Sequence, residues 1–267
     1  MRVAPWLLSA SLGATACTPQ QTRAPTAPES SPTNEETHDE PVLEACGPTG
    51  EQLHGLDWVP ADASLTAVVD LTAADLEAAL VHLAEAARAD DHDLPMDVAF
   101  GFAHWDFQVP LIRATLLQAG FEPAELLALR VGDVGTSWVF GSTCDIDLAL
   151  ERLRSIWGLE VRRTATGALA SPGTEPFAFD VVFLPGDRVA LTPAGRGSDF
   201  TRAVMVPTTS EGPRPSNLLE ALDPAPIRAI VQGPALAYPG RDEPPMTRSL
   251  RASGESLEID GRLAPTS

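Results

Sequence analysis

Five side chains in one stretch of the chain are of types that could hold a metal ion. Asp91, His92 and Asp93 form a run of two carboxylates and an imidazole, and His82 and His104 lie on either side of it. Carboxylate oxygens are typical ligands of Ca²⁺, and imidazole nitrogens bind Zn²⁺. The spacing matches no H-E-x-x-H, paired C-x-x-C or EF-hand pattern, and a solvated charge run that ends a helix explains these residues equally well. The five positions are therefore candidate metal ligands, and no cofactor is predicted.

Other catalytic patterns are weaker. Ser137 follows Gly135-Thr136, but the second glycine of a G-x-S-x-G nucleophile turn is missing, so a strand position explains this serine better. All 18 basic residues are arginine, which excludes lysine-based chemistry. No G-x-G-x-x-G follows a predicted strand. The sequence therefore favours a non-catalytic role as a binding or assembly module, and a periplasmic hydrolase, with or without a metal, is an alternative.

Aromatic side chains offer a third possibility, a groove for a glycan or another small ligand. In a chain with a single tyrosine, the same side chains also fit a hydrophobic core. The candidates are Trp58, Phe100, Phe102, Trp105, Phe107, Trp138 and Trp157.

The first 16 residues have the pattern of a signal peptide. Arg2 precedes a short apolar run that is too short to span a bilayer, and the run ends in small residues before Cys17. Ala14-Thr15-Ala16-Cys17 resembles the lipobox of bacterial lipoproteins, although Ala14 stands where that family prefers leucine. The resemblance implies a lipid on Cys17. Ordinary signal cleavage after Ala16 would cut the same bond and leave a soluble periplasmic or secreted protein.

The other two cysteines form an even pair if Cys17 carries a lipid. Disulfides persist in exported proteins, so we predict a Cys46–Cys144 bond. Two buried free thiols are the alternative.

Residues 17–52 are predicted to be a lipid anchor followed by a disordered tether. The segment is rich in Pro, Thr and Glu and has almost no large apolar side chain, so it cannot offset the entropy cost of folding. The formal net charge of −19 disfavours nucleic acid and anionic lipid surfaces. We expect attachment to the membrane through Cys17 and a partner that is another envelope protein.

The remaining chain is expected to form a main domain over 53–205 and a C-terminal extension over 206–267 that packs on that domain or continues it. Apolar runs and turn residues predict strands at 65–71, 126–131, 137–140, 159–164, 168–170, 177–184, 188–192 and 227–232, and a hairpin over 248–263. Helical spacing predicts helices at 76–88, 109–119, 146–157, 198–205 and 217–222. The elements lack a steady βαβ rhythm. We therefore predict an α+β fold with a mostly antiparallel sheet and helices packed on one face.

The segment Val59-Pro60-Ala61-Asp62-Ala63 before a predicted strand resembles the opening of exported bacterial proteins of unknown function. Gly120-Phe121-Glu122-Pro123 and the segment 183–188 are similar to their later elements. The resemblance implies an envelope lipoprotein with an α+β domain and supplies no catalytic residues. Because Thr18 is not aspartate, similarity to Gram-negative lipoproteins implies the outer membrane, facing the periplasm or the cell surface.

Overall fold

A computed structural model describes residues 56–89, 94–142, 144–157, 160–164, 167–171, 179–205, 214–233 and 246–263. The helices are α1 (Leu76–Ala89), α2 (Met96–Phe102), α3 (Trp105–Gln118), α4 (Ile146–Trp157), α5 (Gly197–Met205) and α6 (Pro215–Glu220), after a short 3-10 turn η2 (Leu56–Trp58). The strands are β1 (Leu65–Asp70), β2 (Glu125–Arg130), β3 (Thr136–Gly141), β4 (Glu160–Thr164), β5 (Gly167–Ser171), β6 (Phe179–Leu184), β7 (Arg188–Pro193), β8 (Ile227–Gly233), β9 (Met246–Ala252) and β10 (Leu257–Leu263).

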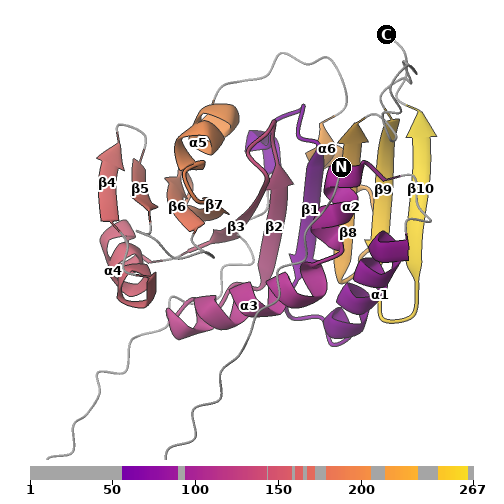
Figure 1. Cartoon of the computed structure of the whole chain (residues 1–267), viewed down its shortest axis with the longest axis horizontal. Coiled ribbons are helices and arrows are strands. Elements are labelled where there is room, and N and C mark those ends of the chain that lie inside the picture. Colours follow the sequence, from indigo (N-terminus) through magenta and orange to yellow (C-terminus); the bar gives the residue numbers. More distant parts are fainter. Residues whose placement is uncertain are drawn as a thin grey trace, which may run out of the picture. The chain divides into compact units, whose positions relative to one another are not determined.

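The ten strands form one sheet in the order β10-β9-β8-β1-β2-β3-β7-β6-β5-β4 (Figure 1). Each strand runs antiparallel to its neighbours. The predicted α+β class with a mostly antiparallel sheet is therefore confirmed.

The central strands are apolar on both faces, so both faces of the sheet must be covered. Along β1, Leu65, Ala67 and Val69 belong to one hydrophobic cluster, whereas Val68 belongs to another. This alternation follows from the two-residue period of a strand. The same alternation occurs along β2, β3, β6 and β7.

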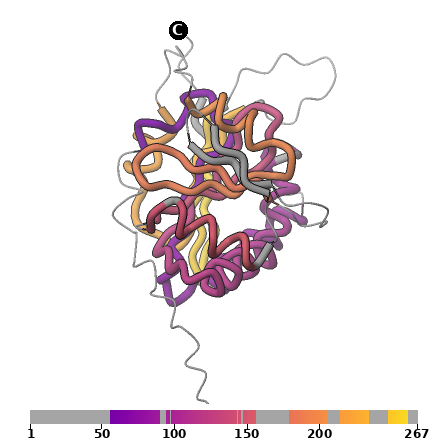
Figure 2. The backbone as a smooth tube through the Cα atoms, turned by 90° about the vertical axis from the view of Figure 1, so that its left-hand side faces the viewer, coloured from indigo at the N-terminus to yellow at the C-terminus, as the bar shows by residue number. Residues whose placement is uncertain are grey.

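The first face carries the helices α1 to α4, which contribute their buried side chains to the larger cluster. Figure 2 shows α1 to α3, coloured from purple to magenta, gathered at one side and at the lower end of the strands. The prediction of helices on one face holds for these four. The short helices α5 and α6 place Phe200 and Leu219 in the second cluster and cover the opposite face.

The C-terminal strands continue the main sheet. β8 pairs with β1 from Leu65↔Val231 to Val69↔Ile227, and β9 and β10 follow in turn. In the turn between β9 and β10, the Gly254 amide donates a hydrogen bond of 2.8 Å to Oδ2 of Asp75, which immediately precedes α1. The described parts of 53–205 and of 206–267 therefore belong to the same sheet. The predicted signal peptide and tether lie outside the described residues.

Helix α3 begins earlier than predicted. Helical spacing predicted a start at residue 109. The helix instead begins at Trp105 and contains Pro110 in its interior. As a result, Asp106, Phe107 and Gln108 are helical residues with fixed directions, and all three line the site described next.

Candidate ligand-binding groove

A cavity of about 890 Å³ lies between α3 and the strands β3, β6 and β7. We call this cavity the α3 groove. Its volume falls within the range of roughly 300–1,000 Å³ that is usual for small-molecule sites. Eight of its described lining residues are apolar, namely Phe107, Leu111, Ile112, Trp138, Phe179, Leu191, Pro193 and Ala194. Five others are polar, namely Arg88, His104, Asp106, Gln108 and Thr115.

The helix wall of the groove forms because the apolar face of α3 is wider than the part of it that packs against the sheet. Val109 and Ile112 are buried against the sheet, 1% and 4% exposed. Phe107 and Leu111 lie beside that stripe, where the sheet no longer covers them, and are 63% and 44% exposed. Residues four apart share a helix face, so these two side chains form one apolar edge along the groove.

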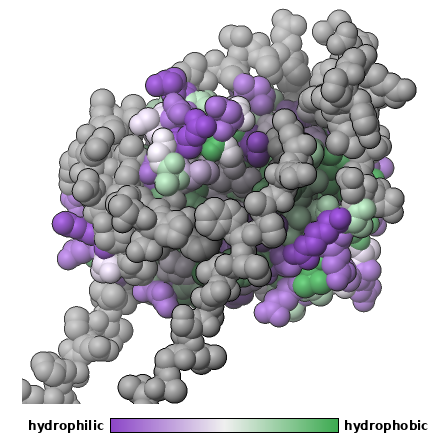
Figure 3. Space-filling model, in the orientation of Figure 1, coloured by the Kyte–Doolittle hydropathy of each residue, from purple (hydrophilic) through white to green (hydrophobic). Residues whose placement is uncertain are grey.

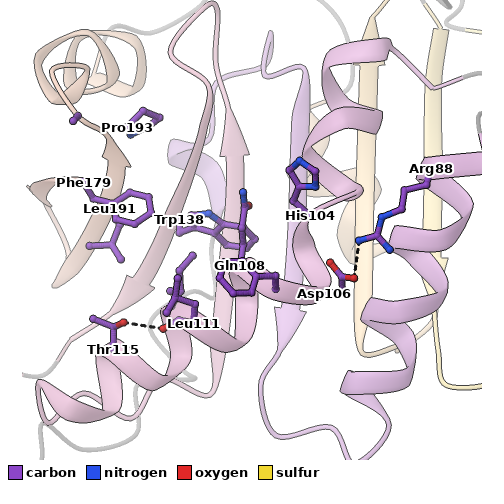
Figure 4. Close-up of a pocket in the computed structure, with 13 residues that line it drawn as sticks. Arg88, His104, Asp106, Gln108, Leu111, Thr115, Trp138, Phe179, Leu191 and Pro193 are labelled. Carbon is purple, nitrogen blue, oxygen red and sulfur yellow. Dashed lines mark hydrogen bonds and ion pairs between the residues drawn. The ribbon is translucent and has the colours of Figure 1, made fainter. Parts of the chain in front are cut away.

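The sheet wall comes from neighbouring strands whose register places their side chains together. Trp138 on β3 is opposite Leu191 on β7, and Phe179 on β6 is opposite Pro193 on β7. Figure 4 shows Trp138, Leu191 and Phe179 on the sheet side, with Leu111 and Gln108 facing them from α3.

Trp138 is held by a row of aromatic rings. The Phe102 and Trp105 rings are 4.7 Å apart and nearly perpendicular, and the Trp105 and Trp138 rings are 4.9 Å apart. Trp105 and Phe102 are fully buried, and Trp138 is 2% exposed. Close-packed rings of this kind restrict one another, so the inner wall of the groove is rigid.

The charged residues of the groove neutralise each other. Arg88 Nη2 donates to Asp106 Oδ2 at 2.7 Å and to the Ala103 carbonyl oxygen at 2.6 Å. The Asp106 Oδ1 atom is sealed from solvent and makes no hydrogen bond to the described residues. The groove therefore offers a ligand no unpaired formal charge from this pair.

The remaining polar groups differ in their availability. Thr115 Oγ1 donates to the Leu111 carbonyl oxygen at 2.8 Å within the helix. His104 is exposed, and its ring meets that of Phe100 edge-on at 4.9 Å. The half-buried Gln108 amide makes no hydrogen bond within the described part of the chain, and it lies near the centre of the site (Figure 4).

The mostly apolar described lining of the α3 groove suits the binding of an apolar ligand. An activated nucleophile needs a base within hydrogen-bond distance, and the described groove lining contains no such pair. Its only hydroxyl, on Thr115, is committed to a backbone carbonyl. Its only carboxylate, on Asp106, is committed to Arg88.

Large apolar side chains are also exposed outside the lining of the groove, and two of them, Met96 and Phe100, are four residues apart on α2. They include Val81, Met96, Phe100, Leu117, Leu148 and Met205. Figure 3 shows hydrophobic residues, in green, between hydrophilic ones, in purple, on the described part of the face viewed in Figure 1. Scattered exposed apolar residues are ordinary for a folded protein. The cavity, rather than exposure alone, therefore distinguishes Phe107 and Leu111.

The predicted metal ligands are only partly within the described structure. His82 is half-buried on α1, and His104 precedes α3. Asp91, His92 and Asp93 lie outside the described residues. Among the residues that are described, no group of three or more His, Cys, Asp or Glu side chains could hold a metal ion. A site that includes residues 91–93 stays a prediction.

The predictions for the cysteines also involve residues that the structure does not describe. Cys144 precedes α4, and the other two cysteines, Cys17 and Cys46, lie outside the described residues. The pairing with Cys46 and the lipid on Cys17 therefore stay predictions.

Two of the seven candidate aromatic residues do line the groove, namely Phe107 and Trp138. Phe102 and Trp105 belong to the core instead. Trp58 lies under the Arg188 guanidinium, 5.2 Å from the ring centroid. The groove residues that sequence reasoning missed are mostly aliphatic, such as Leu111 and Leu191, and no local signal separates them from core residues.

The chain matches no family model, no curated protein and no solved structure. The resemblance of residues 58–71 to exported bacterial proteins is therefore still a prediction. In the described part of the chain, no helix is both long enough and apolar enough to cross a bilayer.

Proposed function

We propose that this protein is a non-catalytic binding module of the cell envelope, attached to a membrane through a lipid on Cys17, and that it binds its ligand in the α3 groove. The observation that carries the proposal is the apolar cavity of about 890 Å³, whose described lining residues form no nucleophile–base pair. The envelope location is supported by the small residues before Cys17, which resemble a lipobox.

The ligand is either part of another envelope protein or a small molecule. The cavity favours the small molecule, because such sites are concave, mostly apolar and equipped with a few polar groups. A protein interface is usually broader and flatter, and would need roughly 800 Å² on each partner.

Binding in the groove can be tested with the neutral apolar dye Nile red and the full chain carrying Cys17→Ser, so that no lipid is attached. Leu111→Asp places a carboxylate in the groove and should weaken dye binding by at least about tenfold, because an unpaired charge is costly in an apolar site. Leu117→Asp is the matched control: the same helix carries this residue, its exposure is 48% against 44%, and it does not line the groove.

The control should bind the dye like the parent protein. Equal dye binding by the Leu111→Asp variant and the parent protein would refute the groove as the binding site.

The envelope location has an independent test, the intact mass of the protein from its native membranes. A diacyl or triacyl addition on Cys17 is expected, and a chain without lipid would contradict membrane attachment.

A further inference from the structure

Building on the proposed function, we infer that the α3 groove takes an uncharged amphiphile, a molecule with an apolar body and one neutral hydrogen-bonding end. The inference rests on the balance of charges in the groove, on the single open amide at its centre and on the apolar majority of its walls.

The body of the ligand must be apolar because both walls are. The helix wall contributes Phe107 and Leu111, and the sheet wall contributes Trp138, Phe179 and Leu191. A glycan carries hydroxyls along its whole length, and each hydroxyl buried without a partner costs free energy. The described lining offers too few open polar groups to satisfy such a ligand.

We expect the polar end of the ligand to be neutral, because Arg88 and Asp106 in the described lining already neutralise each other. Arg88 and Asp106 are paired at 2.7 Å, so a carboxylate would compete with Asp106 and an ammonium would compete with Arg88. Either ion would also lose its hydration when it enters the cavity. For anions, the net charge of −19 adds long-range repulsion.

Gln108 is the group that would hold the neutral end. Its amide can both donate and accept, and none of the described residues uses it. It lies one helical turn from Leu111 on the same face of α3, so a ligand can contact the apolar wall and the amide together. A hydroxyl, ester or amide group matches this partner.

Three ligands with one body and different ends test the inference: 1-octanol, octanoate and octylammonium, each displacing Nile red from the full chain carrying Cys17→Ser at pH 7. We expect 1-octanol to bind at least about tenfold more tightly than either ion. Gln108→Leu should lower the affinity for 1-octanol by roughly threefold to tenfold. Gln118→Leu is the matched control, because Gln118 is an exposed residue of the same helix outside the groove, and it should have no effect.

The outcomes separate this inference from the proposed function. If the three ligands bind equally, or if an ion binds best, the inference is overturned while Nile red binding that depends on Leu111 still supports the groove. If 1-octanol binds best but Gln108→Leu and Gln118→Leu have the same effect, the role of Gln108 is overturned. If Leu111→Asp leaves the affinity for Nile red unchanged, the proposed function itself is refuted.

Discussion

Trp105 is the residue whose removal should test most directly how the groove is built. It is fully buried at the start of α3, and its ring contacts Phe102 on α2 and Trp138 on β3. Replacing it with alanine removes the middle ring of the row that supports the groove wall. Replacing it with phenylalanine keeps a ring in the same place.

The expected magnitudes follow from two opposing effects. A buried Trp→Ala change costs about 3–5 kcal/mol of unfolding free energy, because it leaves a cavity that the surroundings cannot fill. The Trp105 Nε1 atom, however, is buried without a hydrogen-bond partner in the described structure, and such an unsatisfied donor carries a penalty of about 1–3 kcal/mol that the substitution removes. We therefore expect Trp105→Ala to lower the free energy of unfolding by about 2 kcal/mol. Trp105→Phe should change stability by less than about 1 kcal/mol, because it removes the same donor and leaves a smaller cavity.

Urea unfolding followed by far-UV circular dichroism, without reductant, measures both variants on one scale. Nile red titration of the folded variants then reports the groove. Trp105→Ala should also weaken dye binding, because Trp138 loses the ring against which it packs, whereas Trp105→Phe should retain dye binding. A loss below about 1 kcal/mol for the alanine variant, or equal losses for both variants, would refute this account of the aromatic row.

Three further predictions concern the framework around the site. Gly120→Ala should lower the free energy of unfolding by about 2–4 kcal/mol, because Gly120 has φ +77° and an added Cβ would lie 2.7 Å from Nη1 of the buried Arg152. Gly132→Ala, at φ +56° with no atom within 4 Å of the added Cβ, should cost only the backbone strain of about 1–2 kcal/mol. Equal losses in urea unfolding would show that the contact with Arg152 is irrelevant. Asp180→Ala should lower the free energy of unfolding by about 1–2 kcal/mol and destabilise the start of α5, because Asp180 Oδ2 accepts a hydrogen bond of 2.8 Å from the buried Gly197 N–H. Asp180→Asn keeps an acceptor and should lower the free energy of unfolding by less. Cys46→Ser should make Cys144 reactive toward alkylating reagents without reductant. It should also lower the free energy of unfolding by about 4–5 kcal/mol, because the predicted disulfide would close a loop of about 100 residues. An unreactive Cys144 in this variant would show that Cys46 is not its partner.

Local signals predicted most elements, because those elements depend on nearby residues. Helix α4 has the predicted bounds, since its apolar residues recur at helical spacing between Ile146 and Trp157. The break between the predicted strands 177–184 and 188–192 also corresponds to the turn between β6 and β7, where Gly186 and Asp187 have φ of +77° and +56°. Such conformations are favourable for glycine and tolerated by aspartate.

The order of the strands could not be predicted in the same way. β1 pairs with β2 and also with β8, which follows it by more than 150 residues along the chain. Backbone pairing carries no residue code, and an apolar run such as Ile227–Val231 fits a position beside several central strands. The sequence therefore predicted a strand at 227–232 without predicting that it completes the centre of the sheet.

The groove shows the same limit at the scale of one helical turn. Val109 and Leu111 are both apolar residues of α3, yet Val109 is 1% exposed and Leu111 is 44% exposed. The difference between them is whether the sheet lies opposite, which depends on where strands β3, β6 and β7 run beneath the helix. Hydrophobic periodicity identifies the face that a helix turns inward, but it does not show how far the covering surface extends. Polar sequence motifs therefore cannot predict a binding cavity that is lined by apolar residues. Its position depends on how the described helices and strands pack together in the folded protein.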